Sequence, residues 1–184
     1  MKQNKIMCAV LALGLAGFAG SQALAADKVK PSAEVEAQIT KTLKATFPEV
    51  VINGMAQETE DGLTFFAVDM TSKGNKIDAD VTADGTLVGT EEAIELKDMP
   101  KPAAKALKKA TKGMKVSFEK ATTYAEADKK DTTGTKAVKL TEPKVAYDAD
   151  VEKDGKKGEY AADADGKIIE SPNWAKTESK EEKD

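Results

Sequence analysis

Carboxylates are the side chains of this sequence that could do chemistry, and many of them stand at alternating positions. Asp78 and Asp80 alternate with the apolar residues Ile77, Ala79 and Val81. Successive residues of a strand point to opposite faces of a sheet, so the apolar set should face a core and the acidic set should face away. The residues that we expect on that opposite face, as candidates for contact with a partner, are Phe65, Asp69, Asp78, Asp80, Asp148, Asp150, Glu152, Glu159 and Asp163.

An acidic sheet face could bind something cationic: a basic protein surface, a polyamine or a divalent ion. The alternative is a wet face whose carboxylates keep the protein soluble, and this is the more common role of such residues. Neutralising Asp69, Asp80, Asp150 and Asp163 together would distinguish the two hypotheses, because only a cation-binding face requires these carboxylates for binding.

Composition excludes several other kinds of chemistry. The chain has no histidine, every basic residue is a lysine, and the one cysteine, Cys8, lies in a segment that we expect to be removed. This argues against a histidine base, a thiol nucleophile and a zinc–thiolate site. Without arginine, and with a formal charge of −4, nucleic-acid binding is not expected. We expect no cofactor, no metal site and no catalytic residues.

Two acidic runs invite a calcium interpretation. The first runs from Asp148 to Glu152, but Lys153 follows where an EF-hand loop needs glycine. The second runs from Asp163 to Gly166 and lacks the preceding acid. Both are interpreted as ordinary turns. A carboxylate-dependent hydrolase would need a cleft and one raised pKa; the sequence indicates neither, and that hypothesis stays open.

The two ends of the chain are predicted to lie outside the folded part. Residues 1–26 have the lysines, the apolar run and the small residues of a signal peptide, so we expect a periplasmic or extracellular protein. The apolar run is too short to span a membrane, which takes about 20 residues. Residues 175–184 are charged and polar and are predicted to be a disordered tail.

The segment between these ends reads as a helix and strands that occur twice. Ser32 is a predicted N-cap, and Val35, Ile39 and Leu43 share one face of the helix that follows. Strands joined by Gly-containing turns come next. Phe66, Asp69, Gly74, Asp84 and Gly85 each have a similar residue 81 positions later, at Tyr147, Asp150, Gly155, Asp165 and Gly166.

The second unit differs from the first in its polar middle. Leu107 follows Leu43 at an offset of 64 (107 − 43), whereas the hairpin residues are 81 apart, so about 17 residues (81 − 64) are inserted between helix and hairpin. Residues 122–140 are predicted to be a long loop or an extended hairpin tip.

The aromatic residues are few. Tyr147 and Tyr160 fall on the apolar register and are predicted to lie in the core, whereas Tyr124 and Trp174 are candidate interface anchors. Trp174 either pins the terminus onto the second unit or is exposed for a partner.

The pattern resembles the PepSY-like, β-lactamase-inhibitor-protein-like (BLIP-like) group of exported bacterial proteins. The resemblance rests on the signal peptide, on Phe47-Pro48 after the first helix, and on the two Ala-Asp-Gly turns in a helix-then-hairpin context. It implies an α+β fold made of two tandem helix-plus-antiparallel-sheet units, here residues 32–95 and 98–174. The chain departs from the best-known inhibitors in its polar insertion and its lack of stapling cysteines.

The resemblance also implies a function. Members of this group bind proteins without catalysing a reaction; some inhibit enzymes, and related domains restrain peptidases. We therefore expect a protein partner, such as a secreted or envelope enzyme. The second hypothesis is a periplasmic protein that binds a cation or small ligand on its acidic face.

Overall fold

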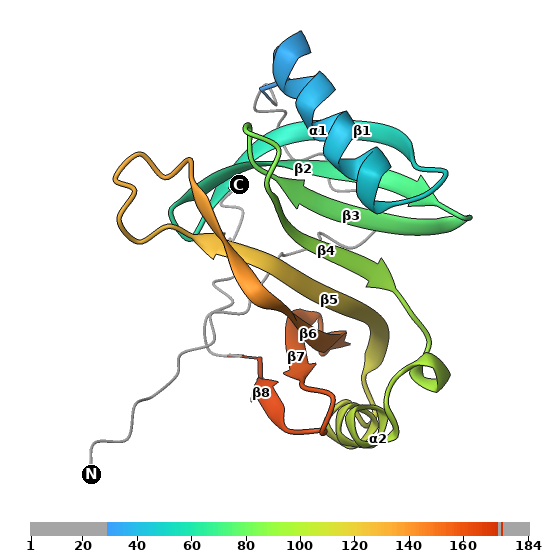
Figure 1. Ribbon diagram of the computed structural model, residues 1–184. Coiled ribbons are helices and arrows are strands. Elements are labelled where there is room, and N and C mark those ends of the chain that lie inside the picture. Colours follow the sequence, from blue (N-terminus) through green and yellow to red (C-terminus); the bar gives the residue numbers. More distant parts are fainter. Residues whose placement is uncertain (1–28, 173, 175–184) are drawn as a thin grey trace, which may run out of the picture.

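The computed structural model describes residues 29–172 and 174. The predicted signal peptide and tail lie outside these residues. The described chain belongs to the α+β class, with both helices and one antiparallel sheet of eight strands in sequence order (Figure 1). The elements are α1 (Ala33–Thr46), β1 (Val51–Glu60), β2 (Leu63–Ser72), β3 (Asn75–Val81), β4 (Leu87–Ala93), the 3₁₀ helix η1 (Leu96–Asp98), α2 (Lys101–Ala110), β5 (Lys115–Ala127), β6 (Ala137–Lys153), β7 (Lys156–Ala162) and β8 (Ile168–Glu170).

Each helix packs one apolar stripe on the sheet. In α1 the Ser32 side chain accepts a hydrogen bond from the Val35 backbone N–H at 3.4 Å, as an N-cap does, and Ile39 and Leu43 are buried. In α2 the buried residues are Ala103 and Leu107. A four-residue spacing places each pair on one side of its helix.

The two helices cover the same face of the sheet at its two ends. Residues paired across antiparallel strands point to the same side, and the register runs from Ile77 through Glu92 and Lys120 to Tyr147. One core cluster joins Ile39 and Leu43 to the inward residues of β2 and β3, and another joins Leu107 to Ala149 and Ala162. Tyr147 and Tyr160 pack against the second cluster, as predicted. The opposite face has no helix on it in the described chain (Figure 1).

The hairpin turns use the residues that their backbone requires. The second residues of three tight turns are Gly62, Gly74 and Gly155, and both central residues of each turn have positive φ. This conformation matches the twist of the flanking strands and favours Asp-Gly or similar pairs.

Two wider turns hold the helices against the sheet. Gly85 donates its backbone N–H to the Thr82 carbonyl, and its own carbonyl accepts from Thr42 of α1 at 2.8 Å. The same backbone bond joins Gly166 to Asp163, and the Gly166 Cα lies close to Pro102 of α2. These turns are 81 residues apart, in agreement with the predicted offset; the duplication of the unit itself stays a prediction.

Residues 122–140, for which the sequence left open a loop or a hairpin tip, are an extended hairpin. Its outer part, residues 123–140, is called the hairpin arm here. The tip is organised by the Asp131 carboxylate, which accepts backbone hydrogen bonds from Thr133, Thr135 and Lys136 at 2.8–3.0 Å. The arm leans on the first half of the sheet, because the Thr64 N–H donates to the Gly134 carbonyl at 2.6 Å.

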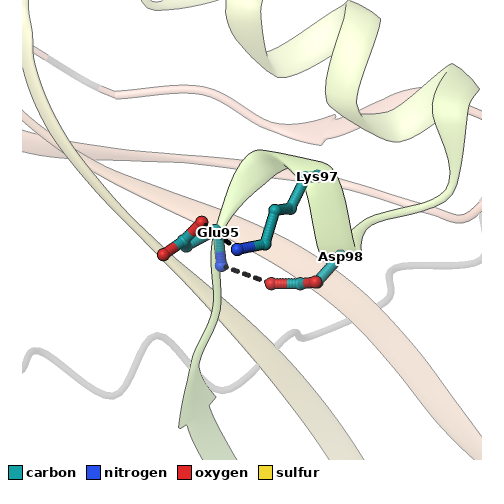
Figure 2. Close-up of polar contacts among 3 residues, drawn as sticks. All are labelled: Glu95, Lys97 and Asp98. Carbon is teal, nitrogen blue, oxygen red and sulfur yellow. Dashed lines mark hydrogen bonds and ion pairs between the residues drawn. The ribbon is translucent and has the colours of Figure 1, made fainter.

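The link between the two halves is short and follows β4 directly. Ile94 donates to the Phe118 carbonyl, and η1 then turns the chain toward α2. Figure 2 shows the contacts of this turn: the Glu95 N–H donates to Asp98 Oδ2 at 3.3 Å, and Lys97 pairs with Glu95 at 2.7 Å. Because β4 also pairs with β5, one sheet runs through both halves.

Gly166→Ala should destabilise the protein more than Gly155→Ala. Both residues have positive φ, which costs about 1 kcal/mol for alanine. A Cβ at position 166 would also lie 2.5 Å from the Pro102 carbonyl oxygen, whereas the space at 155 is open. We expect a loss of about 1 kcal/mol at 155 and at least about 2 kcal/mol at 166, measured by urea unfolding. Equal losses would show that the turn does not hold α2 in place.

Candidate functional site

The carboxylates predicted to share a face do so with the exception of Asp163, and the structure adds others to them. Asp69 pairs with Asp78, and Asp78 pairs with Glu91. Farther along the sheet Glu119 pairs with Asp148, and Asp150 pairs with Glu159. The acidic face, as the term is used below, is the helix-free side of the sheet that carries Asp69, Asp78, Asp80, Glu91, Glu119, Asp148, Asp150, Glu159 and Glu170.

Like charges on this face stand directly opposite one another. Neighbouring strands lie about 4.8 Å apart, and a like-charged pair across two strands destabilises the sheet. The pairs described above fall on four strand–strand junctions. The face is therefore built at a cost to folding, unless protons or a ligand offset the repulsion.

The centre of the acidic face is removed from water. The exposed fractions are 3% for Asp80, 9% for Glu91 and 7% for Asp148. Within the described chain, Glu91 Oε2 and Asp148 Oδ1 are buried and accept no hydrogen bond. A buried polar atom without a partner costs free energy. Glu91 lies on β4 and Asp148 on β6, on either side of the carboxyl group of Glu119 on β5.

Burial and mutual repulsion raise the pKa values of these groups together. Burial is the largest cause at each one, and it raises the pKa of Asp80 to about 8 and that of Glu91 to about 9. The pKa rises to about 7 for Glu119 and Asp148 and to about 8 for Glu159. Neighbouring carboxylates add to each shift. Much of the face is therefore protonated at neutral pH.

Lysines act on this face from its borders. Lys76 lowers the pKa values of Asp78 and Glu119, and Lys157 lowers that of Asp150, but in each case burial outweighs the lysine. Glu152 forms an exposed ion pair with Lys115 at 3.5 Å, and Lys157 is its cross-strand neighbour on β7. Of the predicted acidic residues it is therefore the least suited to meet a cation.

Phe65 faces the expected side but is not available for contact. It is completely buried in a cluster with Leu63 and Val88, against which Ala127 and Ala137 of the hairpin arm pack. The expectation of an open face is thus wrong at this end, because the arm covers it.

Asp163 does not join the acidic face. Its Oδ1 accepts backbone hydrogen bonds from Asp165 at 3.1 Å and from Lys167 at 2.9 Å, so it organises the turn before β8. The interpretation of residues 163–166 as a turn is correct. The other run, from Asp148 to Glu152, is not a turn but part of β6.

Trp174 lies beside β7. A Cβ added at Gly158 would lie 3.3 Å from the Trp174 ring and 2.5 Å from the Pro172 side chain. Of the two alternatives, the structure supports the one in which Trp174 pins the terminus onto the second half. Tyr124, the other candidate anchor, packs against the core cluster of the first half.

Sequence reasoning missed Glu91, Glu119 and Glu170. Both sequence neighbours of Glu91, Thr90 and Glu92, are polar, so no alternation with apolar residues shows on which face of the sheet Glu91 lies. Glu119 follows Phe118, and the alternation of Met114, Val116 and Phe118 in the sequence could have placed it on the opposite face. Glu170 is positioned by the bulge between Ala161 and Ala162.

Solved structures resemble this architecture at low sequence identity. A DUF2874 family protein from Bacteroides uniformis matches with a TM-score of 0.54 over 81% of this chain and 94% of its own, at 14% identity. A BLIP-like protein from Bacteroides fragilis matches with a TM-score of 0.50 over 77% and 85%, also at 14% identity. The fold is BLIP-like.

A third protein with this BLIP-like fold comes from Bacteroides eggerthii and is described as periplasmic; its TM-score is 0.53 at 14% identity, over 77% of this chain and 88% of that one. No family model and no curated protein matches the sequence. Among the described residues, no helix is long and apolar enough to cross a membrane, and no group of acidic side chains is arranged to hold a metal ion.

The free energy of unfolding should fall as the pH rises. Ordinary carboxyl pKa values near 4 apply in the unfolded chain, whereas five groups on the acidic face have folded values of about 7 to 9. Groups with raised folded pKa values contribute their full stability below the unfolded value and lose it as pH passes the folded value. From about pH 5 to pH 9 we expect a loss of at least about 2 kcal/mol, measured by urea unfolding.

The variant Glu91→Gln/Asp148→Asn provides the control for this measurement. It keeps the shape of both side chains but removes two titrating groups, so its stability should change less with pH. A wild-type stability that is flat or rises over this range would contradict the assignment.

Proposed function

We propose that this chain is an exported protein-binding module without catalytic activity, which restrains a secreted or envelope enzyme by covering part of its surface. The observation that carries the proposal is the acidic face. Carboxylates that oppose one another and are partly buried lower stability, and such a cost is typical of functional surfaces. A basic partner surface would offset that cost.

The pKa pattern favours binding over acid–base catalysis. A hydrolase that uses two carboxyl groups needs one protonated and one ionised at the same pH, so its site pushes their pKa values apart. Here burial moves the carboxyl pKa values upward together. Such a surface can release protons when a positively charged partner binds to it.

The predicted location and the fold agree with this proposal. The predicted signal peptide directs the chain to the envelope or beyond, and one fold neighbour is described as periplasmic. Another neighbour is described as BLIP-like. A rigid sheet surface is a suitable scaffold for covering an enzyme, because its residues lose little freedom on binding.

We further propose that the acidic face arose from duplication of one helix-and-sheet unit. Asp69 and Asp78 pair across β2 and β3, and Asp150 and Glu159 pair across β6 and β7. The offsets are 150 − 69 = 81 and 159 − 78 = 81, the same as those of the turns. The proposed units are residues 32–95 and 98–174, and each contributes one such pair.

A second candidate function is the binding of a cation or small cationic ligand in the periplasm. The unpartnered oxygens of Glu91 and Asp148 favour it, because a small ligand with N–H donors could satisfy both. This function would need no protein partner.

Immobilised protein should capture one saturable partner from an envelope extract of its own organism. We expect the activity of a captured enzyme to fall on binding. Neutralising half-buried carboxylates in Asp78→Asn/Asp150→Asn/Glu159→Gln should weaken capture by at least about tenfold, because charge pairing guides such interfaces. The matched control is Glu36→Gln/Glu49→Gln/Asp165→Asn, which removes three exposed charges away from the acidic face. Equal loss in both variants, or no loss in either, would refute the proposed interface.

A further inference from the structure

We propose that the partner completes the acidic face with a lysine or arginine side chain that lies over β5 and donates hydrogen bonds to Glu91 on β4 and Asp148 on β6. This rests on the proposed function, because it specifies what the partner presents to the face. It assigns a recognition site at the junction of the two halves of the sheet, where β4 pairs with β5.

The site is marked by two acceptors that the protein leaves unused. Glu91 and Asp148 are each more than nine-tenths buried, and Glu91 Oε2 and Asp148 Oδ1 have no hydrogen-bond partner among the described residues. Buried carboxylates in folded proteins are usually paired with a cation or hydrogen-bonded. Donors supplied from outside the chain would satisfy these two oxygens.

Small residues continue the cross-strand row that contains Glu91. Ala121 pairs with Glu91 on one side and with Ala146 on the other, so the row that crosses the junction continues from a carboxylate into two alanines. Ala121 is half-exposed, whereas Ala146 is 9% exposed. A side chain that lies over Ala121 would reach carboxylates on three strands.

Most of the charged groups on this face are acidic. They are Asp69 on β2, Lys76, Asp78 and Asp80 on β3, Glu119 on β5, Lys144 and Asp150 on β6, Lys157 and Glu159 on β7 and Glu170 on β8, with Glu58 and Glu60 of β1 acting on Asp80. Lys144 is paired with Glu126. Lys76 and Lys157 influence Asp78, Glu119 and Asp150 rather than Glu91 or Asp148. A cation from outside would therefore meet oxygens of Glu91 and Asp148 to which no lysine of the described chain donates a hydrogen bond.

The arrangement suits a nitrogen cation better than a metal ion. The two unpartnered oxygens come from β4 and β6, strands separated by β5, so their backbones lie about 10 Å apart. Calcium needs six to eight oxygens within about 2.6 Å of one point, and the described residues hold no such group. A guanidinium or ammonium group donates several hydrogen bonds in different directions and can bridge carboxylates on separate strands.

Entry of the cation would displace protons. Burial raises the pKa of Glu91 to about 9 and the pKa values of Glu119 and Asp148 to about 7, so Glu91 is protonated at neutral pH and the other two are partly protonated. A positive charge favours their ionised forms. Binding should therefore release protons to the buffer and should strengthen as pH rises from about 6 to 8.5.

Penta-L-lysine and penta-L-arginine are the probes for this site. We expect calorimetry near pH 8.5 to show saturable binding, with a heat that depends on the buffer's ionisation enthalpy because protons are released. Glu91→Gln/Asp148→Asn should weaken binding by about tenfold or more, whereas the control Glu36→Gln/Asp165→Asn should not. Equal affinity in both variants, or no proton release, would overturn the proposal. Tighter binding of spermine or Ca²⁺ than of either peptide would also overturn it, in favour of a small ligand.

A second variant tests the site without removing any carboxylate. Ala121→Lys places an ammonium group beside Glu91, its cross-strand neighbour. If the site accepts a cationic side chain, this variant should melt at a higher temperature above about pH 8 and should no longer bind the peptides. Ala121→Met is the control for bulk alone. Unchanged peptide binding by Ala121→Lys would contradict the proposal even if the carboxamide variant failed to fold.

Capture experiments with two variants distinguish this inference from the proposed function. Loss of capture with the rim variant Asp78→Asn/Asp150→Asn/Glu159→Gln, together with normal capture by Glu91→Gln/Asp148→Asn, would support the protein-binding function and overturn the assigned site. Loss of capture with both variants, but not with the control, would support both.

Discussion

The main physical constraint on this structure is the repulsion among carboxylates that lie on one face of the sheet and are partly buried there. Asp69, Asp78 and Glu91 form one row across three strands, and Glu119 and Asp148 form a second pair nearby. Glu91, Glu119 and Asp148 are compatible with folding while protons neutralise them, because burial raises their pKa values. The same burial leaves oxygens of Glu91 and Asp148 without donors. Stability and recognition are therefore coupled through one set of side chains.

The fold concentrates this repulsion by placing its apolar packing on the other side. Both helices cover the opposite face, with Leu43 in one core cluster and Leu107 in the other. The hairpin arm then closes one end of the acidic face over Phe65. What remains is a strip of carboxylates that runs across the junction of the two halves, where a partner could contact both at once.

Local patterns were enough to predict much of this architecture. The Ser32 cap, the spacing of Ile39 and Leu43 and the alternation in β2 and β3 are determined by neighbours in sequence. The burial of Asp80 and the covering of Phe65 depend on contacts between distant strands. Local patterns also failed for Asp163. The alternating pattern placed it on the acidic face, whereas its side chain accepts hydrogen bonds within a turn. Several members of the acidic face were thus predictable from the sequence, whereas the others, and the burial and pairing of the whole set, required the assembled sheet.

The most direct test of this account is a carbon-13 NMR titration of the side-chain carboxyl groups of Glu91 and Asp148, with and without penta-L-lysine. The account predicts that both groups titrate well above pH 4 in the free protein, near 9 and 7 respectively, and that the peptide moves both midpoints downward. Ordinary midpoints near pH 4 in the free protein, or midpoints that the peptide leaves unchanged, would contradict it.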